Sequence, residues 1–167
     1  AEELSIKPEQ VLPFSTGVIG QLLPIDSIEN NANQLVNSLT ENGLVDVAKG
    51  ILTTDLVEKY CSVSFEVNGV TVNLSGVAKG SGMIRPNMAT MLSFIVTDIG
   101  ASQDELQQCL NISVNQSFNR ITIDGDTSTN DACTLSATNQ SGILYSQCKV
   151  EFQNALNELT KKLAHMI

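Results

Sequence analysis

The amino-acid sequence predicts one α/β domain in which helices and a sheet pack in layers. Segments with an apolar residue every three or four positions alternate with short β-branched runs, and no repeat or low-complexity linker separates them. The chain has 167 residues, of which 42% are hydrophobic and 16% charged, as in a globular protein with a sizeable core. Because Trp is absent and aromatic residues make up only 4%, that core must be mainly aliphatic.

The first part of the chain is expected to hold a short strand and a helix. Residues 11–14 are strand-like and lead into the segment STGVIG at 15–20. A helix is expected next, with Asp26 or Ser27 as N-cap and Gly43 as its C-terminal stop. Its apolar stripe comprises Ile28, Ala32, Leu35, Val36 and Leu39.

The middle of the chain predicts a hairpin followed by another strand. Residues 60–76 alternate β-branched and polar residues on both sides of Asn68-Gly69, which is the strongest two-residue turn signal. Residues 90–98 form the next expected strand. It begins where the polar loop RPNMA ends, so Thr90 stands at a loop-to-strand junction.

The remaining elements follow from capping and spacing. Ser102 and Glu105 form a capping box in front of a helix with Leu106, Leu110 and Val114 on one face. Strands are expected at 120–124 and 133–137, separated by the polar run DGDTSTND at 124–131. A final helix carries its apolar stripe on Phe152, Leu156, Leu159, Leu163 and Met166.

Charge and cysteine usage exclude several classes of function. The net charge is −9 and no Lys/Arg cluster is present, so nucleic acid and anionic membranes are unsuitable partners. The four cysteines form no CxxC pair, which predicts free thiols in a reducing cytosol and no zinc site. A calcium loop that started at Asp124 would need Gly at its sixth position and Glu at its twelfth, but these positions hold Thr129 and Leu135, so we expect a turn and no metal.

Thr90 is a nucleophile candidate without an obvious base. The single histidine, His165, lies in the last predicted helix and is expected at the surface. Cleavage of the Ala89–Thr90 bond would give Thr90 a free α-amino group with a pKa of about 7.7–8.0, within reach of its own hydroxyl. Two other features have both a functional and a purely structural interpretation. Thr16-Gly17 could form an oxyanion hole or only a turn, and Lys79 could be a functional residue or only a solvated surface charge.

Four segments in order resemble one known family. They are STGVIG, LTTD at 52–55, VAKGSGMIRPNMATMLSFIVTD at 77–98 and FNRITIDGDTSTND at 118–131. Together they closely resemble the ornithine acetyltransferases, the bifunctional glutamate N-acetyltransferases of cyclic arginine biosynthesis. The resemblance implies self-cleavage between Ala89 and Thr90, after which Thr90 carries an acetyl group from N2-acetylornithine to L-glutamate.

The resemblance also implies roles for individual residues. Thr16 and Gly17 would form the oxyanion hole, while Thr53, Lys79 and Thr90 would contact substrate. No cofactor is implied, although acetyl-CoA is an additional candidate donor. The implied fold is a layered α/β sandwich shared with certain self-cleaving aminopeptidases, and the implied assembly is a cytoplasmic heterotetramer of two alpha and two beta pieces.

The family's greater length suggests that this chain is one partial domain. Residues 1–89 would be the C-terminal part of the alpha chain and residues 90–167 the N-terminal part of the beta chain. Two alternatives remain open: a self-processing amidase or aminopeptidase that uses the same threonine, and a truncated, unprocessed and inert domain.

Overall fold

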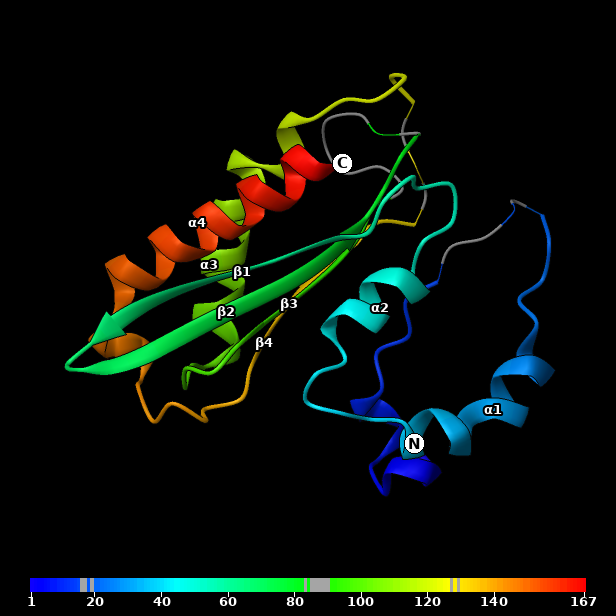
Figure 1. Cartoon of the computed structure of the whole chain (residues 1–167), viewed down its shortest axis with the longest axis horizontal. Coiled ribbons are helices and arrows are strands. Elements are labelled where there is room, and N and C mark those ends of the chain that lie inside the picture. The colour runs from blue at the N-terminus through cyan, green and yellow to red at the C-terminus, as the bar shows by residue number, and fades with distance from the viewer. Residues whose placement is uncertain (16–17, 19, 83, 85–90, 127, 129) are drawn as a thin grey trace. The chain divides into compact units, whose positions relative to one another are not determined.

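The structure, a computed structural model, describes residues 1–15, 18, 20–82, 84, 91–126, 128 and 130–167. It divides into two compact units, Ala1–Gly43 and Leu44–Ile167. The larger unit holds a four-stranded sheet with helices packed on it (Figure 1), which confirms the predicted α/β class.

The sheet is mixed and has the order β1-β2-β3-β4. The β1–β2 and β2–β3 pairs are antiparallel, whereas β3 and β4 are parallel. The parallel pair is possible because α3 lies between the two strands in sequence and provides the crossover. The strands are β1 (Lys59–Val67), β2 (Val70–Lys79), β3 (Leu92–Thr97) and β4 (Ala132–Ala137).

The predicted hairpin is confirmed as β1–β2. Asn68 and Gly69 both have positive φ, 52° and 79°, which a tight two-residue turn requires and which Asn and Gly tolerate best. The predicted strands at 90–98 and 133–137 correspond to β3 and β4. In the larger unit, the sequence therefore anticipated all four strands.

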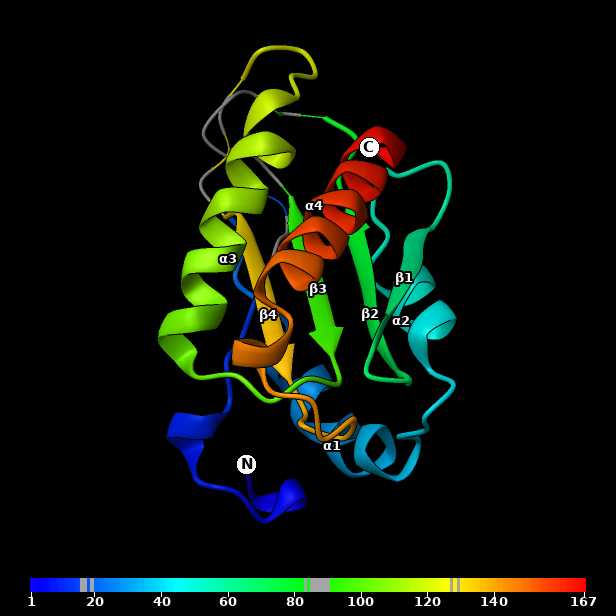
Figure 2. The same ribbon diagram turned by 90° about the vertical axis from the view of Figure 1, so that its left-hand side faces the viewer.

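Two long helices, α3 (Gln103–Gln116) and α4 (Lys149–Met166), lie side by side on one face of the sheet, as Figures 1 and 2 show. The Ser102–Glu105 capping box is confirmed: the Ser102 N–H donates to the Glu105 carboxylate at 2.9 Å, and the Glu105 N–H donates back to the Ser102 hydroxyl at 3.4 Å. No helix among the described residues combines the length and apolar character that crossing a bilayer requires.

The apolar stripe of α4 forms the centre of the core. Four of its five predicted core side chains are buried: Phe152, Leu156, Leu159 and Leu163. Each buried side chain of this kind contributes about 1.5–3 kcal/mol to folding. Met166 is 41% exposed, so its predicted place in the core is wrong. It lies in the last turn, next to the C-terminal residue of the chain.

A short helix that the sequence analysis did not anticipate, α2 (Leu44–Gly50), contacts β1 and β2. It lies on the side of the sheet away from α4 (Figures 1 and 2). Ala48 is the residue of α2 that is fully buried. Seven residues are too few for a periodic pattern to stand out, so packing rather than periodicity defines this helix.

In the smaller unit, the predicted helix exists with different ends. It is α1 (Ile25–Asn37), with Pro24 as N-cap, so Asp26 and Ser27 lie inside it rather than at the cap. It ends at Asn37, six residues before Gly43, with Ser38 as C-cap, and none of its residues is buried. Two short 3-10 turns precede it, η1 (Glu2–Leu4) and η2 (Pro8–Gln10).

Two predicted strands are absent. Residues 11–14 form no strand, because a strand needs a hydrogen-bonding partner and Pro13 lacks the N–H that a ladder uses. Residues 120–124 form only isolated bridges to Ile84 after the 3-10 turn η3 (Phe118–Arg120). Asp124 and Gly125 have positive φ, 56° and 80°, which ends the extended conformation. A further 3-10 turn, η4 (Tyr145–Gln147), precedes α4.

Candidate functional site

The candidate site lies where β2 ends and β3 begins. The two strands run antiparallel, and Lys79 at the end of β2 is paired with Leu92 at the start of β3. Leu92 comes two residues after Thr90 in the chain. Thr90, Ala89, Thr16 and Gly17 lie outside the described residues, so their roles stay predictions. Thr53 and Lys79 are described.

Lys79 is a buried lysine, with 5% of its surface exposed. Residues in a strand alternate between faces, and the neighbouring Ala78 belongs to the core beneath α3 and α4, so Lys79 lies on the opposite face. Burial lowers the pKa of the Lys79 ammonium group, while the nearby Asp55 carboxylate raises it. The surface-charge alternative for Lys79 is therefore wrong.

Asp55 joins three parts of the chain. One carboxylate oxygen, Oδ1, accepts hydrogen bonds from Lys59 Nζ at 2.6 Å and from the Gly80 N–H at 2.8 Å. The other oxygen, Oδ2, accepts from the Thr53 N–H at 3.3 Å. The Asp55 and Lys59 side chains are only 1% and 3% exposed, so they form a buried ion pair.

The pKa of Asp55 reflects this environment. Burial raises the pKa of the carboxyl, but the hydrogen bonds from Lys59, Gly80 and Thr53 outweigh burial and hold it below its usual value. Asp55 is therefore ionised at neutral pH. It links the loop that carries Thr53 to Gly80, the residue directly after Lys79, and so brings together the two described residues with predicted substrate roles.

A second contact strengthens the same link. The Thr54 and Ser81 hydroxyl oxygens are 2.5 Å apart. Both residues are next to the Asp55 contacts, one on the loop and one beyond the end of β2. Thr53 itself is exposed, which leaves its side chain accessible to a ligand.

The segment 121–131 contacts the chain on both sides of residues 85–90. Before them, Ile84 exchanges two backbone hydrogen bonds with Ile123, at 3.0 and 2.5 Å. After them, the Met91 N–H donates to the Asp131 carboxylate at 2.6 Å. Ile84 and Met91, the nearest described residues on the two sides of Ala89–Thr90, are therefore both hydrogen-bonded to this segment.

Asp131 lies in a partly buried position at the end of the DGDTSTND run. Burial raises the pKa of its carboxyl, opposed by hydrogen bonds from the Met91 N–H and the Ser128 hydroxyl. Among the described residues of the run, the Ser128 hydroxyl accepts from the Asn130 N–H at 3.1 Å, a local side-chain-to-backbone bond of the kind expected in a turn. Among the described residues, no three His, Cys, Asp or Glu side chains lie close enough to hold a metal ion.

His165 is exposed near the end of α4, as predicted. The four cysteines are free thiols, also as predicted. Burial raises the pKa of Cys133 to about 12 and raises the pKa of Cys61 and Cys148 as well. These three thiols are therefore poor nucleophiles at neutral pH.

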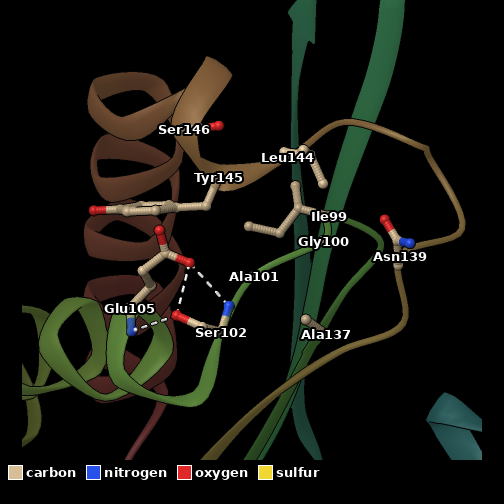
Figure 3. Close-up of a pocket in the computed structure, with 10 residues that line it drawn as sticks. All are labelled: Ile99, Gly100, Ala101, Ser102, Glu105, Ala137, Asn139, Leu144, Tyr145 and Ser146. Carbon is tan, nitrogen blue, oxygen red and sulfur yellow. Dashed lines mark hydrogen bonds between the residues drawn. The ribbon is translucent and has the colours of Figure 1, made fainter.

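A hollow of about 440 Å³ lies at the opposite end of β3 (Figure 3). It is lined partly by Ile99, Leu144 and Tyr145, and the Glu105 carboxylate in it is bonded to Ser102. The six residues of β3 span roughly 20 Å, so this hollow is distant from Lys79 and Met91. We do not assign the candidate site to it.

Comparison with known proteins identifies the family. The ArgJ family profile matches residues 1–167. This chain belongs to the ArgJ family. It is 46% identical over 167 residues to the arginine biosynthesis bifunctional protein ArgJ of Pseudomonas fluorescens, and all of the chain and 40% of that protein are covered.

Archaeal members of the ArgJ family are equally similar. The glutamate N-acetyltransferases of Methanococcus maripaludis and Methanocaldococcus jannaschii are each 46% identical over 170 residues, with all of this chain and 42% of each relative covered. The chain thus spans about two fifths of the curated relatives that it matches.

The ArgJ resemblance rested on motifs, and three residues near the site were missed by that approach. Asp55 was quoted within LTTD and Asp131 within DGDTSTND, but neither was given a role, and Lys59 was not considered. These residues stand out because their charged groups are wholly or partly buried. Burial depends on the folded structure and cannot be recognised from the sequence alone. Lys59 is the first residue of β1, and a lysine at such a position is normally expected to be exposed to solvent.

Proposed function

We propose that the full-length protein containing this chain transfers an acetyl group from N2-acetylornithine to L-glutamate. Membership of the ArgJ family and the NMAT sequence around Thr90 support this proposal. The observation that carries it is the buried Lys79. In the sheet, Lys79 is paired with Leu92, which comes two residues after Thr90 in the chain. A fixed cation there suits a donor and an acceptor that both carry an α-carboxylate.

The first step is cleavage of the chain itself. The Thr90 hydroxyl oxygen attacks the Ala89 carbonyl carbon, and the peptide C–N bond breaks as the Ala89 acyl group moves from nitrogen to oxygen. Water then hydrolyses this ester, which leaves a carboxylate on Ala89 and both a free hydroxyl and a free α-amino group on Thr90. In the acetyl transfer that follows, this α-amino group acts as the base, a role for which His165, exposed near the end of α4, is not proposed.

Acetyl transfer then takes two steps. The Thr90 hydroxyl loses its proton to the α-amino group and attacks the acetyl carbonyl of N2-acetylornithine, and ornithine leaves with the proton. The amine of L-glutamate attacks the acetyl-threonine ester next, which releases N-acetylglutamate and restores the hydroxyl. Thr16 and Gly17 would donate to the oxyanion in both steps, and Thr53 and Lys79 would hold the substrates. Acetyl-CoA is a further candidate donor.

The two pieces produced by cleavage would stay together without the peptide bond. Residues 74–79 of β2 pair with residues 92–97 of β3, so the central ladder of the sheet joins the two pieces. The helix α4 also packs on β1 and β2 across the same boundary. We further propose that the complete fold is a layered α/β sandwich, that two copies of each piece form a heterotetramer, and that the protein acts in the cytoplasm.

Intact-mass measurement and a transfer assay test the proposal. The purified full-length protein should contain two fragments that meet at Ala89–Thr90, and it should convert N2-acetylornithine and L-glutamate into ornithine and N-acetylglutamate with ping-pong kinetics. Thr90→Ala should abolish both cleavage and transfer. Transfer that persists undiminished in Thr90→Ala would contradict the mechanism.

The same assay separates the alternatives. A cleaved protein that hydrolyses peptides and transfers no acetyl group would be an amidase or aminopeptidase. A folded protein that is neither cleaved nor active would be the inert domain. Glu158→Gln is a suitable control, because Glu158 is an exposed residue of α4.

A further inference from the structure

We propose that Asp55 is a positioning residue that holds Thr53 and Lys79 in register for the carboxylate of the substrate. This role is not one of those that the family motifs assign, and it rests on the function proposed above for the identity of the substrate. The geometry that supports it involves described residues only.

The first support is that Asp55 is hydrogen-bonded to the backbone at Thr53 and at Gly80, the residue that follows Lys79. Its carboxylate accepts from the N–H of Thr53 and from the N–H of Gly80, at 3.3 and 2.8 Å. A single side chain thereby fixes the loop before β1 to the end of β2. Movement of the Thr53 loop relative to Lys79 would break at least one of these bonds.

The second support is the burial of the ion pair. Removing two charges from water costs free energy that their attraction often fails to recover, so a buried pair is weak evidence for a role in stability alone. The chain offers a direct comparison in Glu158–Lys162, which has the same i,i+4 spacing and the same 2.6 Å distance but side chains that are about half exposed. Only the buried pair also bonds backbone N–H groups at the candidate site.

The third support is electrostatic. Lys59 balances the charge of Asp55 within the buried pair. The Asp55 carboxylate is also the group whose charge opposes the effect of burial on Lys79 and favours its ammonium form. Asp55 therefore both holds Gly80, the residue next to Lys79, and favours the charged form of Lys79.

The test compares substrates with and without the carboxylate. Asp55→Asn keeps an oxygen acceptor and removes the charge. Because Lys59 would then be buried without its partner, this variant could fail to fold, so Asp55→Leu/Lys59→Met, which replaces the pair by apolar side chains, is measured as well. The control is Glu158→Gln. Each full-length variant is assayed for transfer from N2-acetylornithine and from N-acetylputrescine, the same donor without its α-carboxylate.

We expect the folded double variant to be cleaved at Ala89–Thr90 as in the wild type. Its KM for N2-acetylornithine should rise at least tenfold, with kcat within threefold and the KM for N-acetylputrescine unchanged. A general structural effect would instead alter both donors equally. Glu158→Gln should match the wild type.

Two results would overturn the proposal, and they are distinguishable. If the wild type transfers acetyl groups and the folded double variant keeps the wild-type ratio of the two KM values, Asp55 does not position the site, and the proposed function stands. If the wild-type protein transfers no acetyl group from either donor, the proposed function fails, and the role of Asp55 fails with it.

Discussion

The backbone N–H of Met91 donates a 2.6 Å hydrogen bond to the carboxylate of Asp131. These residues are 40 positions apart in the chain, and the bond fixes the start of β3 to the end of the DGDTSTND run. Met91 is also the residue that directly follows Thr90 in the sequence. The contact therefore fixes the residue that directly follows the proposed nucleophile in the chain.

Removing the Asp131 carboxylate should slow the proposed self-cleavage. We expect Asp131→Ala to reduce the rate of precursor cleavage at least tenfold, because the Met91 amide loses its acceptor. Asp131→Asn should be milder, since an amide oxygen still accepts. A time course of intact mass after expression of the full-length precursor measures this effect. Asp126→Ala, an exposed carboxylate of the same run, is the control; equal rates for Asp131→Ala and the control would contradict the prediction.

Loss of the Asp55 charge should destabilise the protein in a pH-dependent way. Breaking a buried ion pair by removing one partner costs about 3–5 kcal/mol. The pKa of Asp55 is lowered in the folded state, so its contribution is complete above the unfolded value near 3.8 and is lost as pH falls through the lower folded pKa. Urea unfolding should therefore show a large gap between the wild type and Asp55→Asn at pH 7 and a smaller one at pH 3.

The exposed pair serves as the control for this measurement. Glu158→Gln removes one charge from a solvated pair of the same length and should leave stability nearly unchanged. A loss of stability in Asp55→Asn no larger than in Glu158→Gln would show that the buried pair is not needed for folding.

Gly76 is required for close approach of α4 to β2. A Cβ atom at this position would lie 3.0 Å from Leu163 Cδ1 and 3.2 Å from Ile95 Cγ1. We expect Gly76→Ala to cost about 1–3 kcal/mol, because the core must shift to admit the methyl group. Gly50→Ala is the matched control, since nothing lies within 4 Å of its added Cβ. Thermal unfolding of the two variants should rank them in that order, and similar melting temperatures would refute the packing argument.

Cys133 should resist alkylation in the native protein. Burial raises the pKa of its thiol to about 12, so the reactive thiolate is scarce at pH 8. Iodoacetamide treatment followed by peptide mass analysis should show modification of Cys133 only after urea is added. Rapid native labelling of this residue would contradict its assignment as an inert thiol.

Local signals in the sequence predicted most of the larger unit. The Asn68-Gly69 turn, the Ser102–Glu105 capping box and the apolar stripe of α4 each depend on residues close in the chain, and each is present in the structure. The failures share a cause. Residues 11–14 and 120–124 have strand-like composition, but composition does not supply the partner strand that a ladder needs.

The candidate site was predicted only where the residues themselves carry a motif. Lys79 and Thr53 were selected by the resemblance to the family. In the structure, Asp55 accepts hydrogen bonds from the N–H of Thr53 and from the N–H of Gly80, the residue after Lys79. The part of Asp55 itself was not predicted, because its contacts to Lys59 and Gly80 depend on where the loop after α2 passes the end of β2. No spacing rule connects those positions.

The sequence by itself determined the family, the fold class and the position of the proposed nucleophile, because motifs, turn residues and periodic stripes act over a few neighbouring residues. Only the tertiary structure decided which charges are buried, which backbone groups they hold, and that one segment, 121–131, contacts the chain on both sides of residues 85–90. Burial and long-range hydrogen bonds arise from the packing of residues distant in the chain, and packing is a property of the folded molecule.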